Sequence, residues 1–165
     1  MKMATPFLKV YDAFLARITA DEWTLEEELA IVERDWQELL KMAIARFKYP
    51  RVSLEFEEVS AADTDDAAPQ LKIYQFKEDL TNAEIQVLAT YMKHEWSKRC
   101  VASWEHIGQL YTSKDFSMAN HLDKLNDMEA RVALECEGAK DDYDKSRGHS
   151  PASIFRKLAG KKSRG

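Results

Sequence analysis

Residues 81–96 read Thr81-Asn-Ala-Glu-Ile-Gln-Val-Leu-Ala-Thr-Tyr-Met-Lys-His-Glu-Trp96 and carry the clearest structural signal in this chain of 165 residues. Thr81 followed three residues later by Glu84 is a capping box, which is typical of the first turn of a helix. Apolar residues then recur at three- and four-residue steps, which predicts a buried helical face reaching about Leu110. The sequence leaves open whether this is one long rod or a helix broken near residues 100–103. The apolar positions are Ile85, Leu88, Ala89, Met92, Trp96, Val101, Trp104 and Ile107.

A second helical pattern follows at once, from about Ser117 to Tyr143. Because residues 111–116 form a short link, we expect these two helices to be antiparallel neighbours.

Two more helices are predicted upstream. The first runs from about Thr5 to Thr19, with Thr5 as its N-cap and Pro6 at its first helical position. The second runs from about Leu25 to Phe47 and should end before Pro50, because the residue before a proline avoids the helical region. Thr24 and Glu27 would form its capping box. Trp36 and Trp96 fall within the apolar stripes, so they are interpreted as core residues rather than as platforms for stacked bases.

Residues 50–78 have a different texture, in which apolar and polar residues alternate. This pattern predicts one strand over residues 51–56 and a second one from about Leu71, separated by an acidic loop at residues 61–68, and hence a hairpin-like arm. An isolated hairpin is marginally stable in water, so the arm would need a neighbouring surface, which a second subunit could supply. The residues expected to make that inter-subunit contact are Val52, Leu54, Phe56, Leu71 and Ile73.

Charge divides the chain unevenly. All 29 acidic residues lie at or before Asp144, whereas the segment from Lys145 onward has seven basic residues and no acidic one. Within that tail, Ser150 and Pro151 can start a short helix that Gly160 stops. Such a helix is too short to be stable alone, so it either docks or is unfolded. Its apolar face would comprise Ile154, Phe155 and Leu158, with Arg156, Lys157, Lys161 and Lys162 as the basic residues around it.

Several function classes find little support in the sequence. No run of about 18 apolar residues could span a membrane, and no signal-peptide core is visible, so we expect a soluble intracellular protein. His94 is followed by Lys98 rather than by a second histidine four residues on, and no glycine-rich phosphate loop occurs. We therefore predict no catalytic residues, no metal site and no cofactor. A cysteine nucleophile at Cys100 or Cys136 stays open as a minor alternative, although no local signature accompanies either residue.

Three ordered segments resemble one family. They are Glu38-Leu-Leu-Lys-Met-Ala-Ile-Ala-Arg-Phe-Lys-Tyr-Pro-Arg51, then Asp79-Leu-Thr-Asn-Ala-Glu-Ile-Gln-Val-Leu-Ala-Thr-Tyr-Met-Lys-His-Glu-Trp-Ser-Lys-Arg99, then Tyr111-Thr-Ser-Lys-Asp-Phe-Ser-Met-Ala-Asn-His-Leu-Asp-Lys-Leu125. Their order and spacing are similar to those of the head-to-tail connector proteins (adaptor or neck proteins) of tailed bacteriophages. The resemblance covers roughly residues 24–143.

The resemblance implies a non-enzymatic virion protein at the head–tail interface, assembled in the cytoplasm of the bacterial host. Such proteins form rings, usually of twelve copies, beneath the portal protein. The ring extends the channel through which genomic DNA passes without sequence-specific binding, and it offers a platform for the next neck or tail protein. Similar adaptors insert a C-terminal segment into the portal, which would make Ile154, Phe155 and Leu158 the anchors here.

The sequence thus predicts a mainly α fold, an antiparallel bundle of about four helices with an inserted β-hairpin-like arm and an extended C-terminal tail. The helical domain would span residues 1–146, including the arm at 50–78, and the basic tail residues 147–165. The alternative function is a DNA-binding or regulatory helical protein that acts through the basic tail, since cationic side chains supply affinity for phosphates.

Overall fold

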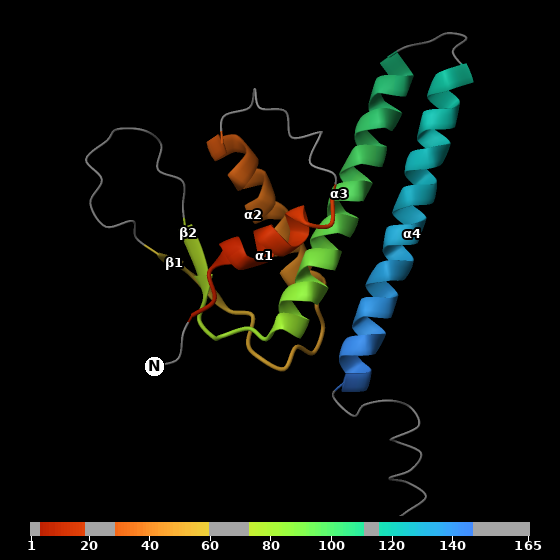
Figure 1. The fold of residues 1–165 in the computed structure, drawn as a ribbon. Coiled ribbons are helices and arrows are strands. Elements are labelled where there is room, and N and C mark those ends of the chain that lie inside the picture. Colours follow the sequence, from red (N-terminus) through yellow and green to blue (C-terminus); the bar gives the residue numbers. More distant parts are fainter. Residues whose placement is uncertain (1–3, 19–28, 60–72, 111–115, 147–165) are drawn as a thin grey trace, which may run out of the picture.

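The computed structural model describes residues 4–18, 29–59, 73–110 and 116–146. Over these residues the chain is mainly helical with one two-stranded antiparallel sheet, as the sequence predicted (Figure 1). Within this part of the chain, no helix combines the length and apolarity needed to cross a membrane. The elements are α1 (Phe7–Leu15), α2 (Leu29–Arg46), β1 (Phe56–Val59), β2 (Ile73–Phe76), α3 (Asn82–Leu110) and α4 (Phe116–Ser146).

Helix α3 begins at the predicted capping box. The backbone N–H of Thr81 donates to Oε2 of Glu84 over 2.8 Å, and the Thr81 hydroxyl donates to the same oxygen over 2.5 Å. The N–H of Ile85 then donates to the Thr81 carbonyl over 3.1 Å, which closes the first turn. The helix continues without a break through residues 100–103, so the long rod is the form that the chain adopts.

Helices α3 and α4 lie side by side as antiparallel rods (Figure 1). Inside their seam, the Cys136 thiol donates to the Thr90 carbonyl over 3.4 Å. At the margin, Nζ of Lys93 lies 2.7 Å from the Glu135 carboxylate. An exposed ion pair contributes at most about 1 kcal/mol, so apolar burial along the seam supplies most of the stabilisation.

The hydrophobic core forms where α1 and α2 pack against the N-terminal half of α3. Trp36 and Trp96 are half-buried and pack against this core, so their place in the apolar stripes is confirmed, although they lie at the edge of the core. Burying one large apolar side chain contributes on the order of 2 kcal/mol. The large side chains with the least exposure are Val10, Phe14, Leu39, Leu40, Phe76, Leu88 and Met92.

Thr5 does not cap α1, and that expectation was wrong. The N-cap position is Pro6, which has no side-chain cap. The Thr5 hydroxyl instead donates to Oδ1 of Asp79 over 3.0 Å and accepts the N–H of Leu80 over 2.9 Å. The Thr5 carbonyl accepts the N–H of Phe76 over 2.8 Å. Thr5 is fully buried, so water cannot reach the N–H of Leu80 there, and the Thr5 hydroxyl is its acceptor instead.

Helix α2 ends at Arg46, so it stops before Pro50 as expected. Its predicted start and the capping box of Thr24 and Glu27 lie outside the described residues. Tyr49 has a φ of 61°, in the left-handed region, and its side chain is 79% exposed. Pro50 disfavours the right-handed helical region for the residue before it, so α2 cannot continue through Tyr49.

The two strands pair in antiparallel register, from Phe56 opposite Phe76 to Val59 opposite Ile73. The first strand therefore starts where the predicted one was expected to end. Residues 51–54 do not belong to the strand. Val52 and Leu54 are half-buried against the core instead.

The base of the arm packs on its own chain. The Phe7 ring of α1 lies 5.2 Å from the Phe56 ring, 5.6 Å from Tyr74 and 4.8 Å from Phe76, measured between centroids. Pro6 also forms a bridge with Gln75. A hairpin needs such an apolar surface to be stable, and α1 supplies one here.

We expect Thr5→Val to lower the free energy of unfolding by about 1–3 kcal/mol, because the buried N–H of Leu80 loses its acceptor. Urea denaturation of the full chain measures this. The control is Thr90→Val, at another buried threonine. The Thr90 hydroxyl only donates to the Gln86 carbonyl within α3, so its removal leaves no backbone donor unpaired. An equal loss of unfolding free energy in both variants would show that the hydrogen bonds of the Thr5 hydroxyl have no special role.

Candidate functional site

Two of the three segments that carry the resemblance pack directly against each other. These are residues 38–51, which end α2, and residues 79–99, in the first part of α3. The rings of Phe47 and Tyr91 meet edge to face with centroids 5.9 Å apart. The guanidinium of Arg46 lies over the Tyr91 ring, 5.0 Å from its centroid. The two segments therefore form one joint in the tertiary structure.

Tyr143 of α4 extends this joint to a third helix. Its ring packs edge to face on Phe47, at 5.2 Å between centroids. Its hydroxyl donates to Oε1 of Glu84 over 2.8 Å and accepts the N–H of Arg51 over 2.7 Å. The start of α3, the end of α4 and the chain after α2 thus meet at one buried phenol. We call Glu84, Tyr143 and the Arg51 backbone N–H the buried node.

The carboxylate of Glu84 is fully buried, which by itself raises its pKa. The hydrogen bonds from Thr81 and Tyr143 favour the ionised form and outweigh that effect, so the pKa of Glu84 lies below its ordinary value. The buried charge is stable because it accepts several donors at once.

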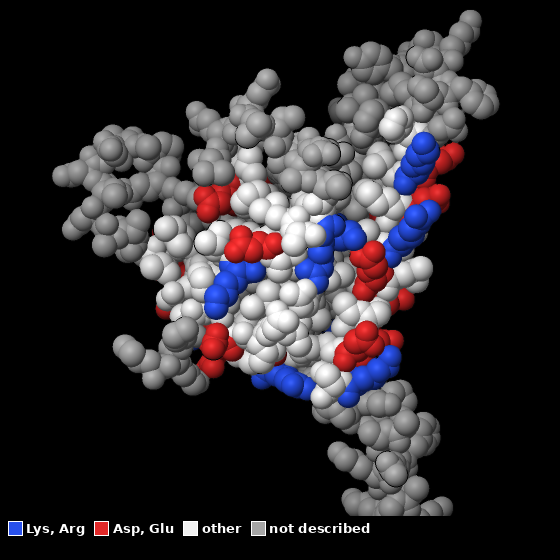
Figure 2. Space-filling model, viewed as in Figure 1, with Lys and Arg blue, Asp and Glu red and all other residues white. Residues whose placement is uncertain are grey.

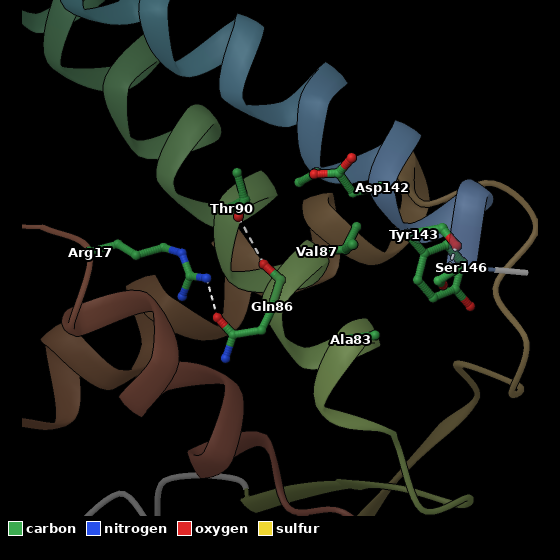
Figure 3. Close-up of a pocket in the computed structure, with 9 residues that line it drawn as sticks. Arg17, Ala83, Gln86, Val87, Thr90, Asp142, Tyr143 and Ser146 are labelled. Carbon is green, nitrogen blue, oxygen red and sulfur yellow. Dashed lines mark hydrogen bonds between the residues drawn. The ribbon is translucent and has the colours of Figure 1, made fainter.

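A groove opens beside the buried node, between the first turns of α3 and the last turns of α4 (Figure 3). Its volume is about 290 Å³. Arg17, which follows α1, reaches across from a third direction and hydrogen-bonds Gln86. The residues that line it include Arg17, Ala83, Gln86, Val87, Ala139, Asp142 and Ser146.

His94 lies within a polar cluster further along α3. Its ring is buried, with Nε2 2.7 Å from the Glu129 carboxylate of α4 and Nδ1 in contact with Arg46 of α2. Because Arg46 can only donate, Nδ1 accepts and Nε2 carries the proton that is donated to Glu129. Arg46 also reaches Glu95 at 3.4 Å. His94 therefore ties three helices together as a satisfied structural histidine.

The cysteine alternative concerns two residues of different exposure. Cys136 is buried, and burial raises the pKa of its thiol to about 11. A thiol with that pKa is protonated at neutral pH, whereas the thiolate is the nucleophile. Cys100 is half-buried on α3. In the described part of the chain, we also find no group of three or more His, Cys, Asp or Glu side chains arranged to hold a metal ion.

The sequence-predicted contact residues fall into two sets. Val52, Leu54 and Phe56 of the arm are half-buried against the core, whereas Ile73 is 49% exposed. Leu71 lies outside the described residues, as does the whole tail set of Ile154, Phe155, Leu158, Arg156, Lys157, Lys161 and Lys162. The inter-subunit role of the arm and the docking role of the tail stay predictions.

Charge on the described body is mixed. On the face shown in Figure 2, basic and acidic side chains are interleaved rather than gathered into one patch of either sign. Among the described residues, ion pairs join Arg99 with Asp35 and Lys140 with Asp144.

Comparisons of this chain with models of protein families, with curated proteins and with solved structures found no match.

Sequence reasoning found one part of the buried node and missed the rest. The capping box identified Glu84 as a residue of the first helical turn, which is a local signal. Tyr143 was predicted as the end of the last helix, and nothing in its spacing indicated that its hydroxyl would reach Glu84. The groove was not predicted, since its residues come from helices distant in sequence.

We expect Tyr143→Phe to lower the free energy of unfolding by about 2 kcal/mol at pH 7, because a buried carboxylate loses a donor and a buried N–H loses its acceptor. The contribution of Glu84 is present above its unfolded pKa, roughly 4.3, and is lost as the pH falls through the lower folded value. The difference between variant and wild type should therefore narrow below about pH 4. Urea denaturation across this pH range measures it.

Tyr11→Phe is the matched control. The Tyr11 hydroxyl is also buried, but it has no hydrogen-bond partner among the described residues. Removing it should leave stability unchanged or raise it by up to about 1 kcal/mol. A loss of equal size in the two variants, or a pH-independent loss in Tyr143→Phe, would contradict the role assigned to the buried node.

Proposed function

We propose that this chain is a structural head-to-tail adaptor, or neck protein, of a tailed bacteriophage. In this proposal it forms a ring under the portal protein, extends the DNA channel and carries the next neck or tail protein. The observation that supports it most is the ordered set of three segments. The first two of these, residues 38–51 and 79–99, are joined through Phe47, Tyr91 and Arg46.

The shape requirements of a ring subunit agree with this proposal. A closed ring needs two different contact faces on each copy, because every copy meets one neighbour on each side. In the proposal, the four helices act as one antiparallel bundle that forms the body of the subunit. The arm, based on α1, and the tail after Ser146 are the extensions that reach neighbours and the portal.

The charge distribution also agrees with a DNA channel. All acidic residues precede Lys145, so the body is strongly acidic as a whole. Affinity for DNA comes mainly from neutralising phosphates, and an acidic wall would let the duplex pass without adhering. The seven basic residues from Lys145 onward support the alternative, in which the tail binds DNA.

The adaptor proposal is tested by co-purifying the full chain with the portal protein encoded beside it and imaging the particles. We expect a ring added to the portal by the wild-type chain. In the triple variant Ile154→Ser, Phe155→Ser and Leu158→Ser, the described body should stay folded while the ring is lost. Each substitution removes one apolar side chain from the short helix, which cannot form without a partner surface.

The matched control removes basic residues from the same tail, as Lys157→Ser, Lys161→Ser and Lys162→Ser. The adaptor proposal expects this variant to keep the portal ring. The alternative expects it to lose DNA affinity, with the slope of log affinity against log salt reduced by about 0.9 for each phosphate that the tail no longer neutralises. Absence of any portal ring together with salt-sensitive DNA binding would replace the first function with the second.

A further inference from the structure

The groove between α3 and α4 is lined by apolar side chains and by polar ones that already have partners. Its apolar residues are Ala83, Val87 and Ala139. Arg17 donates to the Gln86 side chain and, over 2.7 Å, to the Ala13 carbonyl. The surface that the groove offers to a ligand is therefore mainly apolar. Its volume of about 290 Å³ lies just below the range of small-molecule sites, roughly 300–1,000 Å³, and suits a few side chains of a peptide.

We propose that this groove holds the apolar face of the chain's own C-terminal segment, residues 150–159, folded back from the end of α4. The starting point is the position of Ser146, which is both the last residue of α4 and part of the groove. The 19 residues that follow it therefore leave from the edge of the site.

The connection is long enough to reverse direction. The groove extends back along α4 from Ser146 to Ala139, which is about 10 Å at 1.5 Å per residue. Residues 147–151 span up to about 17 Å when extended, and they include Gly148 and Pro151, two residue types that favour turns. Residues 150–159 can therefore lie antiparallel to the last turns of α4.

The pattern of the segment matches the surface. Ile154, Phe155 and Leu158 share one face of a helix that cannot be stable alone. Arg156 and Lys157 lie off that face, so docking would leave them toward solvent. The acidic residue of the groove, Asp142, is 81% exposed and lies 3.4 Å from Nζ of Lys145. The match between segment and groove therefore rests on apolar contact.

The same chain is a better source of this segment than a second copy. A short linker holds the segment near the groove at an effective concentration of the order of millimolar. A segment from another copy would have to bind at the actual protein concentration. Docking within one chain is therefore independent of dilution.

The docking has a regulatory consequence, which rests on the proposed portal binding. A docked segment cannot present Ile154, Phe155 and Leu158 to the portal. If nine-tenths of the chains are docked, the apparent affinity for the portal falls about tenfold. The subunit would then expose its anchors only where the portal competes for them.

Hydrogen–deuterium exchange of the full, isolated chain tests the docking. We expect the amides of residues 152–159 to exchange at least about tenfold more slowly than in an unstructured peptide. Ala83→Arg, at an exposed position in the groove, should abolish this protection by filling the site and repelling the basic segment. Phe155→Ser should do the same, and the two changes together should add nothing. Ala102→Arg, at an exposed position further along α3, is the matched control and should keep the protection.

Each other result overturns the proposal. Unprotected amides in the wild-type chain would show that the segment is not docked. Protection that survives Ala83→Arg would place it elsewhere, and protection that falls on dilution would assign it to a second copy. None of these measurements involves the portal, so they are independent of the proposed function. With the portal added, Ala83→Arg should bind the portal more tightly than wild type, by the factor by which docking lowers the apparent affinity of the wild-type chain. Equal affinity of the two chains would remove the regulatory role.

Discussion

The carboxylate of Glu84 is buried where three segments of the chain meet, and its charge has to be satisfied there. Thr81 supplies two donors from the turn that starts α3, and the Tyr143 hydroxyl supplies a third from the end of α4. Tyr143 in turn accepts the N–H of Arg51. A buried carboxylate without donors would cost several kcal/mol, so the three segments can meet only in an arrangement that brings these groups together. That requirement sets the register of α3 against α4.

The groove follows from that register. With the last turn of α4 held at the first turn of α3, the small side chains of Ala83 and Ala139 line the space between the two helices. Large residues there would close the seam completely, as they do deeper in the core. The groove therefore includes Ser146, the last residue of α4. The C-terminal tail, to which we assign portal binding, starts at that residue.

The interpretation as an adaptor depends on sequence order and tertiary packing together. The three segments of the resemblance are separated along the chain, yet Phe47 and Tyr91 bring two of them into one joint. The polar cluster around His94 adds a second link among α2, α3 and α4. In the proposed function, a body held together in this way is the stable base from which the arm and the tail extend. Neighbouring copies, the portal and DNA would each meet a different part of the proposed subunit.

The sequence alone determined the helices of this protein, because caps and apolar periodicity are local signals. The capping box of Thr81 and Glu84 and the places of Trp36 and Trp96 in the apolar stripes were all read from such patterns. Only the tertiary structure decided what depends on contacts between distant residues. Thr5 was expected to cap its own helix, but burial directed its hydroxyl to Leu80, 75 residues away. The first strand was placed at residues 51–56, but its partner strand and Phe7 of α1 set it at Phe56–Val59. Hydrogen-bond satisfaction in the interior is a property of the whole fold, and no local pattern encodes it.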